Sequence, residues 1–420
     1  MASTAETDVM IAADGVPLKI KLRRAERMRK VWALGLIAPL FIFIVGGFII
    51  PIISLMTLSV EDPEIPEALP RTAAAFSEWD GKGYPSTANM IIFAEELAAA
   101  SRGEFGRVSK RLNYEISGFK SMLKATARAA DGLILLPEDQ ILQGYIDIDK
   151  DWEDQAYWRA IKNASSPYSD YYMLWAVDLK RDGESREIVS VDEGRAVYVE
   201  VLIRTIEISV AVTILCFIMG LPVAYLLATL PTAKSNLLLI LVLLPFWTSL
   251  LVRTTSWLVL LQNEGLVNDL GIWIGLWNEP LELVRNRLGV YIAMTHILLP
   301  FMVLPMFSVM KSINPWHMRA AASLGAPGWK AFLKVYMPQC MPGVGAGTLL
   351  VFILSLGYYI TPALVGGPDD QMVSYWIVQN MGRNANWGLG AALSLILLGI
   401  TMVMFFIYNR FVGIDNLKVN

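Results

Sequence analysis

The sequence predicts an all-α membrane protein with six transmembrane helices and a mainly helical insert between the first two of them. Of its 420 residues, 55% are hydrophobic and 17% are charged, whereas about a quarter of the residues of a soluble domain are charged. Six runs are nearly free of charge and long enough to cross a bilayer core, which takes roughly 20 residues of helix. A long polar stretch, residues 61–200, separates the first run from the second.

The six apolar runs are the expected membrane spans. They cover about residues 31–59, 201–229, 236–261, 288–309, 341–361 and 389–408. A cleaved signal peptide is the alternative interpretation of the first run, but its apolar part would be about 7 to 15 residues long. The first run is longer than that, and a membrane span is therefore favoured.

Basic residues indicate the orientation of the spans. Lys and Arg stay on the cytoplasmic side, and the segment from Lys19 to Lys30 directly precedes the first run. Both termini are therefore expected in the cytoplasm. The expected organisation is a cytoplasmic basic segment at 1–30, a first transmembrane helix at 31–60, an extracytoplasmic insert domain at 61–200, a five-helix core at 201–411 with a cytoplasmic loop at 311–339, and a cytoplasmic tail at 412–420.

The insert is large enough to fold as a small domain. Its Pro-rich start, residues 62–70, is typical of a linker, and residues 86–130 show helical spacing of apolar side chains. Trp and Tyr are dense between Trp152 and Leu179. These aromatic residues could contact a ligand or partner, but the core of a small domain or a belt at the membrane surface is the favoured interpretation.

Several classes of function find no support in the sequence. A net charge of -3 disfavours a nucleic-acid partner, which needs a basic face. No phosphate-binding G-x-x-x-x-G-K-[ST] loop occurs, and His296 and His317 are too far apart for a recognisable metal site. Cys216 and Cys340 lie in apolar runs and are expected to be buried hydrophobes. Gly343-x-Gly345-x-Gly347 is expected to serve close helix packing. We therefore expect no catalytic residue, metal or cofactor in this chain.

The loop from Arg319 to Pro338 carries the most specific pattern. Its Ala-rich start predicts a short helix, Gly325 can take the positive φ that ends it, and Pro338 is expected to mark a new element. The second helix of the loop would have an apolar side made of Phe332, Val335 and Tyr336. Such a side suits insertion into a groove of another protein.

This spacing resembles the EAA loop of binding-protein-dependent ABC importer permeases. Ala320 and Ala321, then Gly325, and after nine residues Val335 and Met337-Pro338 follow the family's pattern. Arg319 stands where the family usually has Glu, so the local salt bridge to a partner is in doubt. The resemblance implies the type I ABC importer permease fold and a partner ATPase dimer, which would bind ATP and Mg. The implied coupling residues are Arg319, Ala320, Ala321, Gly325, Ala326, Phe332, Val335 and Pro338.

Three further segments, residues 244–268, 361–368 and 386–392, resemble spermidine/putrescine-type permeases of that superfamily. The resemblance covers about residues 35–59 and 198–410 and leaves out most of the insert. It implies a bacterial inner-membrane protein that pairs with a second permease subunit, as a heterodimer, and with an extracytoplasmic solute-binding protein. It also suggests a polyamine substrate.

Polar residues in membrane spans are candidates for the substrate pathway. Glu207 could offer a carboxylate to a cation, or it could form an interfacial ion pair with Arg204 one turn earlier. Arg253 is expected roughly 25 Å into a continuous third span, near the outer surface. The candidate pathway residues are Glu207, Arg253, Thr254, Ser256, Trp257, Tyr358, Tyr359 and Thr361.

Two other functions remain open on the sequence alone. An ion-coupled secondary transporter would also have several spans, although it usually shows internal repeats and charges at the membrane midplane. A membrane-anchored sensor would need only one or two spans. Within the importer class, another small organic or anionic substrate is the alternative to a polyamine.

Overall fold

The computed structural model describes residues 18–182, 185 and 187–412. Within these residues the secondary structure is helical apart from one two-stranded hairpin. The chain divides into two compact units, residues 1–57 and residues 58–420. Each unit is described by itself below.

The described part of the first unit is one long helix, apolar after its basic start. It consists of α1 (Leu18–Ile44), the π-helical turn η1 (Val45–Ile49) and α2 (Ile50–Thr57). It therefore starts well before the expected first residue of the span and includes the basic segment. Its apolar side chains, for example Leu36 and Phe41, are largely exposed, as suits a helix surrounded by lipid.

The insert is a helical domain with its own core. Its elements are α3 (Glu64–Ala68), α4 (Pro70–Glu78), α5 (Thr87–Ala99), α6 (Arg102–Glu115), α7 (Phe119–Ile134), η2 (Glu138–Gln140), α8 (Ile141–Ile148), η3 (Lys150–Glu153) and α9 (Gln155–Asn163). The Pro-rich start is thus α3 and α4 and not the expected linker, because Pro70 lies in the first turn of α4, where no N–H is needed.

Aromatic side chains fill the core of the insert. Trp152 and Trp158 are completely buried, and their ring centroids are 4.4 Å apart. Their indole N–H groups donate to the Thr126 hydroxyl at 2.9 Å and to the Trp152 carbonyl at 3.0 Å, respectively. The interpretation as the core of a small domain is confirmed for Trp152, Tyr157 and Trp158, whereas Tyr168 is exposed and Tyr172 packs in a different core.

The two ends of the insert meet in a short antiparallel bridge. Glu61 pairs with Tyr168, and the amide of Asp62 donates to the carbonyl of Pro167 at 2.9 Å. Beyond this neck follow α10 (Tyr171–Trp175) and the hairpin of β1 (Leu179–Arg181) and β2 (Ile188–Ser190), in which Leu179 pairs with Ser190. Tyr172 and Ala176 then pack on the helical core described next.

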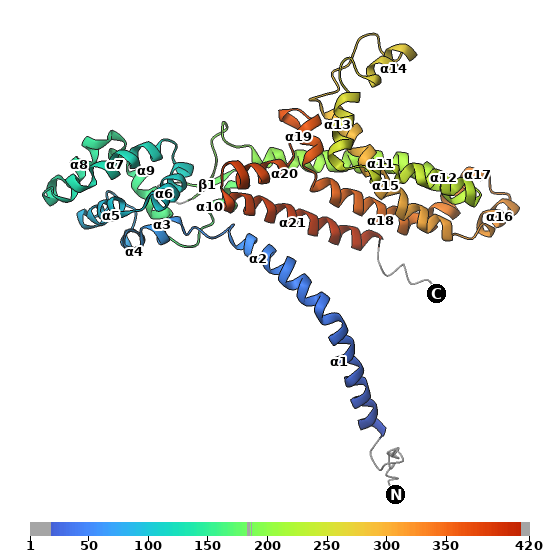
Figure 1. Cartoon of the computed structure of the whole chain (residues 1–420), viewed down its shortest axis with the longest axis horizontal. Helices are drawn as coiled ribbons and strands as arrows, with labels where there is room; N and C mark the ends of the chain where they lie inside the picture. The colour runs from blue at the N-terminus through green and yellow to red at the C-terminus, as the bar shows by residue number, and fades with distance from the viewer. Residues whose placement is uncertain (1–17, 183–184, 186, 413–420) are drawn as a thin grey trace, which may run out of the picture. The chain divides into compact units, whose positions relative to one another are not determined.

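The second unit continues with a helical core (Figure 1). Its elements are α11 (Tyr198–Thr229), α12 (Thr232–Leu243), η4 (Leu244–Trp247), α13 (Leu250–Leu260), α14 (Leu266–Ile274), α15 (Arg287–Ser312), α16 (Trp316–Ser323), α17 (Gly328–Ala331), η5 (Phe332–Tyr336), α18 (Met337–Leu356), α19 (Ile360–Val365), η6 (Pro368–Asp370), α20 (Val373–Val378), η7 (Gln379–Arg383) and α21 (Trp387–Val412).

Three of these helices, α11, α15 and α18, share one buried core. Cys216 and Cys340 are both fully buried in it as free thiols, as expected. A Cβ on Gly343 would lie 2.9 Å from the Pro305 carbonyl, and one on Gly347 would lie 2.9 Å from the Met302 carbonyl. The glycine pattern therefore serves close packing of α18 on α15, which confirms its interpretation.

Five helices of the described chain are long and apolar enough to cross a membrane, and a bent pair brings the number to six if it is one span. The bent pair is the expected third span. It breaks between Trp247 and Leu250 with a bend of 97°, so the prediction of a continuous helix over 236–261 is wrong. Pro245 lacks the N–H that would continue the helix, and the Ser249 hydroxyl caps α13 by accepting from the Val252 amide.

Candidate functional site: the loop and the polar cluster of the helical core

The loop between α15 and α18 turns sharply at Gly325. Gly325 has a φ of +82°, and its amide donates to the Ala322 carbonyl at 3.0 Å, while the Ala326 amide donates to the Ala321 carbonyl, also at 3.0 Å. These two bonds form a Schellman motif, the usual way for a helix to end at a left-handed residue. The predicted positive φ of Gly325 at the end of the first helix is confirmed.

The second helix of the loop faces its own protein, contrary to expectation. The ring of Phe332 lies 5.5 Å and that of Tyr336 5.4 Å from the ring of Tyr225 on α11. Two of the three residues expected to enter a partner are therefore packed on the core.

Pro338 also does not interrupt the helix. It lies in the first turn of α18, directly after the π-helical turn η5, and the run from Gly328 to Leu356 is long enough to be one span.

A shallow cleft of about 600 Å³ lies between α16 and the α17–η5 segment. Its lining residues are His317, Ala320, Ala321, Leu324, Ala326, Lys330, Ala331, Lys334, Val335 and Gln339. His317 Nδ1 and Gln339 Oε1, 2.7 Å apart, connect its two sides. Leu324 beside it is 88% exposed, and Trp329 is also exposed. We call this surface the loop cleft.

Arg319 lies at the edge of this region without a carboxylate partner among the described residues. Its guanidinium carbon lies 4.9 Å from the ring centroid of Trp316, a cation–π distance. The segment from Ile313 to Gln339 contains no Asp or Glu, whereas Arg319, Lys330 and Lys334 are basic. The loop cleft is therefore apolar at its floor and positively charged around it.

The insert and the loop cleft lie at opposite ends of α11. Tyr198, its first residue, packs with Tyr172 of α10, whereas Tyr225 near its other end contacts Phe332 and Tyr336. A helix of 32 residues is about 48 Å long, which exceeds the roughly 30 Å of a bilayer core. The two features are thus separated by more than the thickness of the hydrocarbon layer.

Five of the predicted pathway residues come together with one that was not predicted. The hydroxyls of Thr254 and Thr361 are 3.1 Å apart and buried. Trp257 Nε1 donates to Nδ1 of His296 at 3.0 Å. Arg253 is close enough to His296 and Tyr358 to interact electrostatically with both. The cluster comprises Arg253, Thr254, Trp257, His296, Tyr358 and Thr361, and we call it the polar cluster.

The expectation that Arg253 lies far along a straight third span is wrong. The bend before Leu250 redirects α13, so the helical rise from residue 236 cannot be extended to Arg253. Its Nε–H group is buried and donates to no partner within the described residues, so it can donate to a ligand or to water. From the sequence, His296 was considered only as a possible metal ligand, and its hydrogen bond with Trp257 is what connects it to the pathway candidates.

The remaining pathway candidates lie elsewhere. The hydroxyl of Ser256 is exposed and donates to the Val252 carbonyl of its own helix at 2.7 Å. Tyr359 faces Tyr375 of α20, with ring centroids 6.3 Å apart. Within the described residues, neither side chain has a hydrogen bond to the Thr254–Thr361 pair, and the structure therefore gives no support to a single lining surface that includes them.

Glu207 forms an ion pair with a different residue than expected. Arg204 pairs with Glu200 one turn earlier on α11, whereas Glu207 lies 3.5 Å from Nη1 of Arg287. Arg287 Nε in turn donates to Asp370 at 3.1 Å. The i, i+3 spacing of Arg204 and Glu207 was a weak signal, because Arg204 pairs within its own helix and Glu207 pairs with a residue of the neighbouring helix α15. Arg287 itself was missed, although it is a charge at the very start of an apolar run.

No group of three His, Cys, Asp or Glu side chains that could hold a metal ion occurs in the part of the chain that the structure describes. The side chains of the polar cluster and of the loop cleft offer hydrogen bonds together with charged and apolar contacts.

Comparison with known proteins decides the family. The profile of the family described as binding-protein-dependent transport system inner membrane component matches residues 210–413. The spermidine/putrescine transport system permease protein of Salmonella typhimurium is 33% identical over 223 residues, which are 53% of this chain and 78% of that protein. The chain belongs to this permease family. The corresponding Escherichia coli protein is 32% identical over 222 residues, 53% of this chain and 81% of that protein.

Membership of the family confirms the predicted resemblance and the predicted class of function. The protein is a multi-pass inner-membrane permease of a binding-protein-dependent ABC importer. An ion-coupled secondary transporter is no longer favoured. A solved bacterial ABC transporter that imports alginate is similar with a TM-score of 0.45 and 16% identity, over 53% of this chain and 80% of that one. The matched residues begin within α11, so the insert lies outside them.

Proposed function

We propose that this permease forms half of the translocation pathway of an ATP-driven importer and is itself non-catalytic. The observation that carries the proposal is the exposed loop cleft, which lies at the end of α11 opposite the insert. A separate ATPase dimer would dock there and would bind ATP and Mg. Both termini of the permease would then be cytoplasmic, and the insert would be extracytoplasmic.

The packing of the loop supports a purely mechanical coupling. The α17–η5 segment continues into α18, and Phe332 and Tyr336 contact Tyr225 of α11. A displacement of the loop by the ATPase would therefore move α18 and the end of α11 together, because packed side chains transmit movement. Energy would enter through these contacts and would need no reactive group in the permease.

The charge of the loop cleft defines the surface of its partner. Arg319, Lys330 and Lys334 surround it, and no acidic residue lies between Ile313 and Gln339. The ATPase would therefore present carboxylates at this contact, because complementary charges favour association. On this basis Arg319→Glu would weaken docking, although Glu is usual at the matching position of the family.

Cysteine cross-linking tests the docking and the orientation in one experiment. In a variant without Cys216 and Cys340, Leu324→Cys would cross-link to a co-expressed ATPase and would react with an impermeant maleimide only after the cells are opened. The control is Leu135→Cys in the insert, which is 85% exposed against 88% for Leu324. It would react in intact cells and would not cross-link. The reverse labelling pattern would overturn the orientation, and absence of any cross-link from Leu324→Cys in every nucleotide state would overturn the docking.

We further propose a polyamine as the substrate, delivered by an extracytoplasmic binding protein to a heterodimer of this permease and a second one. The identity of 32–33% to spermidine/putrescine permeases supports it. Arg253 in the polar cluster favours an anionic substrate instead. Uptake of labelled putrescine by the reconstituted importer, abolished by excess spermidine and unaffected by excess citrate, would support the polyamine. Uptake of labelled citrate together with no uptake of labelled putrescine would support the anion.

The insert would contribute to docking of the binding protein or to holding the second permease. Its two ends meet at the bridge between Glu61 and Tyr168, so residues 63–166 can be replaced by a short Gly-Ser link without stretching the chain. We expect this deletion to reduce uptake strongly while the permease still reaches the membrane. Full uptake by the deletion variant would contradict this role.

A further inference from the structure

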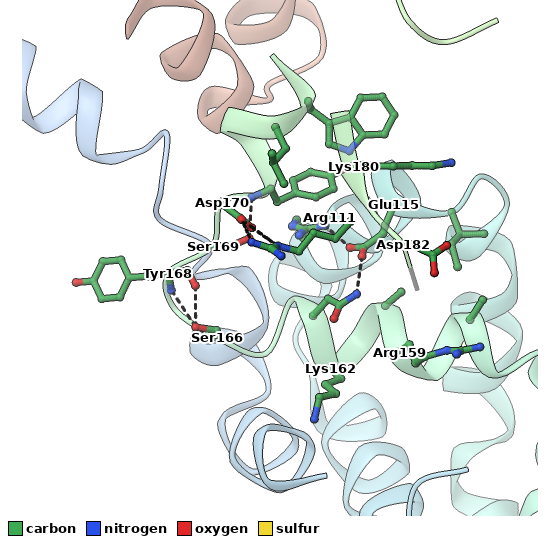
Figure 2. Close-up of a pocket in the computed structure, with 18 of the residues that line it drawn as sticks. Arg111, Glu115, Arg159, Lys162, Ser166, Tyr168, Ser169, Asp170, Lys180 and Asp182 are labelled. Carbon is green, nitrogen blue, oxygen red and sulfur yellow. Dashed lines mark hydrogen bonds and ion pairs between the residues drawn. The ribbon is translucent and has the colours of Figure 1, made fainter. Parts of the chain in front are cut away.

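A cavity of about 670 Å³ lies between the insert and the segment that leads from it into α11. Side chains of α6, α9 and β1 meet around it (Figure 2). The Arg111 side chain, only 1% exposed, pairs with Asp62 at 2.6 Å, and its guanidinium carbon lies 4.0 Å from the ring centroid of Tyr171 on α10. At the mouth, Arg181 of β1 pairs with Asp170. Removal of one partner from a buried ion pair is costly, so α10 joins the insert and the hairpin in one fixed arrangement.

The outer end of α11 is fixed to this junction. The Asp178 carboxylate accepts hydrogen bonds from the amides of Val197, Tyr198 and Val199 at 3.0, 3.0 and 2.7 Å. Asp178 directly precedes β1, and Tyr198 packs in one core with Tyr172 of α10. A force on the inner end of α11 therefore tilts this helix, because its outer end cannot follow.

The inner end of α11 meets the π-helical turn η5 through three aromatic rings. The ring centroids of Phe332 and Tyr336 lie 5.6 Å apart, and their planes are 23° from parallel. Both rings meet the Tyr225 ring edge-on, with angles of 89° and 90° between the planes. An α-helix has about 3.6 residues per turn, so the wider turn of η5 brings these two side chains closer to one line. The π-helical turn thus sets both rings on Tyr225.

Pro338 disfavours an α-helical turn at this place. Proline has no N–H, so residue 338 cannot donate to the Lys334 carbonyl, which is the bond that an α-helix would make there. The Met337 amide donates to the Phe332 carbonyl, and this i→i+5 bond is the π-helical pattern. The residue type at position 338 therefore helps to set the register of η5 relative to α18.

A second contact ties η5 to α16. Gln339 Nε2 donates to the Val335 carbonyl at 2.6 Å, and Gln339 Oε1 lies 2.7 Å from Nδ1 of His317 on α16. An amide oxygen can only accept, so the Nδ1–H group of His317 is the donor. His317, Val335 and Gln339 all line the loop cleft. A displacement of α16 is therefore passed through Gln339 to the backbone of η5.

We propose that Pro338, Gln339 and Tyr225 are positioning residues for the coupling of ATP hydrolysis to transport. Pro338 and Gln339 hold η5 in its π-helical register, so that a displacement of α16 presses the two rings of η5 against Tyr225. The helix α11 then tilts about its fixed outer end. The proposal rests on the proposed docking of an ATPase at the loop cleft, and it adds the route by which the movement reaches the spans.

The test compares two prolines of α18. The reporter is Leu364→Cys on α19, at a position that is 41% exposed, in a variant without Cys216 and Cys340. In the full complex, ATP with vanadate is expected to change the rate at which this cysteine reacts with a maleimide. Pro338→Ala is expected to reduce the change at least about fivefold, the lower end of usual allosteric coupling, while ATP hydrolysis continues. Pro342→Ala, further inside α18, is the control and is expected to keep the change.

Substitutions of Tyr225 and Gln339 separate the coupling route from a loss of fold. Tyr225→Phe keeps the ring that meets η5 and should keep the response, whereas Tyr225→Ala removes the ring and should lose it. Gln339→Met breaks the link to α16 and should also lose the response. If Pro338→Ala does not fold, the two Tyr225 variants decide. Equal responses of Tyr225→Ala and Tyr225→Phe, or of Pro338→Ala and its control, would overturn the proposal.

Cross-linking to the ATPase distinguishes this route from docking. The cross-link from Leu324→Cys should be the same in the parent and in the Pro338→Ala variant. A cross-link lost only in the Pro338→Ala variant would overturn the coupling route, because the substitution would then act on docking. A cross-link that is already absent in the parent would instead refute the proposed docking itself.

Discussion

The hydroxyl oxygens of Thr254 and Thr361 lie 3.1 Å apart, although 107 positions separate the two residues in the sequence. Both side chains are completely buried. The bond joins α13, which follows the bend of the third span, to α19, which follows the fifth span. It therefore holds two irregular segments of the core together beside Arg253 and His296.

Removal of this bond is expected to have a small, coupled effect on stability. Thr254→Val and Thr361→Val each keep the shape of the side chain and lose the hydroxyl. Hydrogen bonds between membrane helices contribute on average about 0.6 kcal/mol, so a double-mutant cycle of unfolding in mixed micelles should give a coupling energy of that order. The Thr255→Val variant is the control, because Thr255 is exposed and bonds only to its own helix. Strict additivity of the first two substitutions would show that the bond does not form.

Arg287 is expected to matter more than Glu207, its partner on α11. The Asp370 side chain is only 8% exposed and accepts from Arg287 Nε, whereas Glu207 is 57% exposed. Arg287→Gln leaves Asp370 with a poorly compensated charge and should cost about 1–3 kcal/mol. Glu207→Gln should cost less than about 1 kcal/mol. Thermal unfolding of the two variants in the same detergent provides the measurement, and a larger loss for Glu207→Gln would refute this ranking.

The packing of α18 on α15 predicts a position-dependent effect of Gly→Ala substitutions. A Cβ at Gly347 would lie 2.9 Å from the Met302 carbonyl oxygen and 3.0 Å from Met302 Sδ. Gly347→Ala therefore forces the helices apart and should cost about 1–3 kcal/mol. Gly399→Ala on α21 is the matched control, since nothing lies within 4 Å of its added Cβ and Ala favours a helix over Gly. The measurement is Tm and membrane yield, which should both be lower for Gly347→Ala than for Gly399→Ala. Equal values for the two variants would show that α15 and α18 are not packed as described.

The stability of the insert is expected to depend on pH through Glu64. Burial, and next the charge of Asp62, raise the pKa of the Glu64 carboxyl from 4.5 to about 7. The folded state then binds more protons than the unfolded state between pH 4.5 and 7, so stability is highest below this window, falls through it and levels off above it. The measurement is the fluorescence of the buried Trp152 and Trp158 during unfolding of the full-length protein, which gives the stability of the insert at each pH.

Glu64→Gln should flatten the decline in the stability of the insert between pH 5 and 7, because the amide does not titrate. Glu67→Gln, which changes a more exposed carboxylate on the same helix, should leave the decline in place. A decline of the same size in the Glu64→Gln variant would assign the pH dependence to another group.

The loop cleft shows which parts of a site a sequence can predict. The turn at Gly325 was predictable, because only the few residues around it decide whether a backbone needs a positive φ. The direction of Phe332 and Tyr336 was not predictable, because apolar spacing marks one face of a helix without telling whether that face meets a partner or Tyr225 of the same chain. Exposed apolar residues that remain for a partner include Leu324, Trp329 and Leu333.

By itself the sequence determined the membrane class, the approximate spans and the position of the loop, since hydropathy, charge bias and turn residues act over short distances. Only the tertiary structure decided the 97° bend of the third span, the contact of Thr254 with Thr361 and the pairing of Glu207 with Arg287. These depend on which helices become neighbours. The packing of the whole core determines which helices are neighbours, and no local pattern of residues encodes this arrangement.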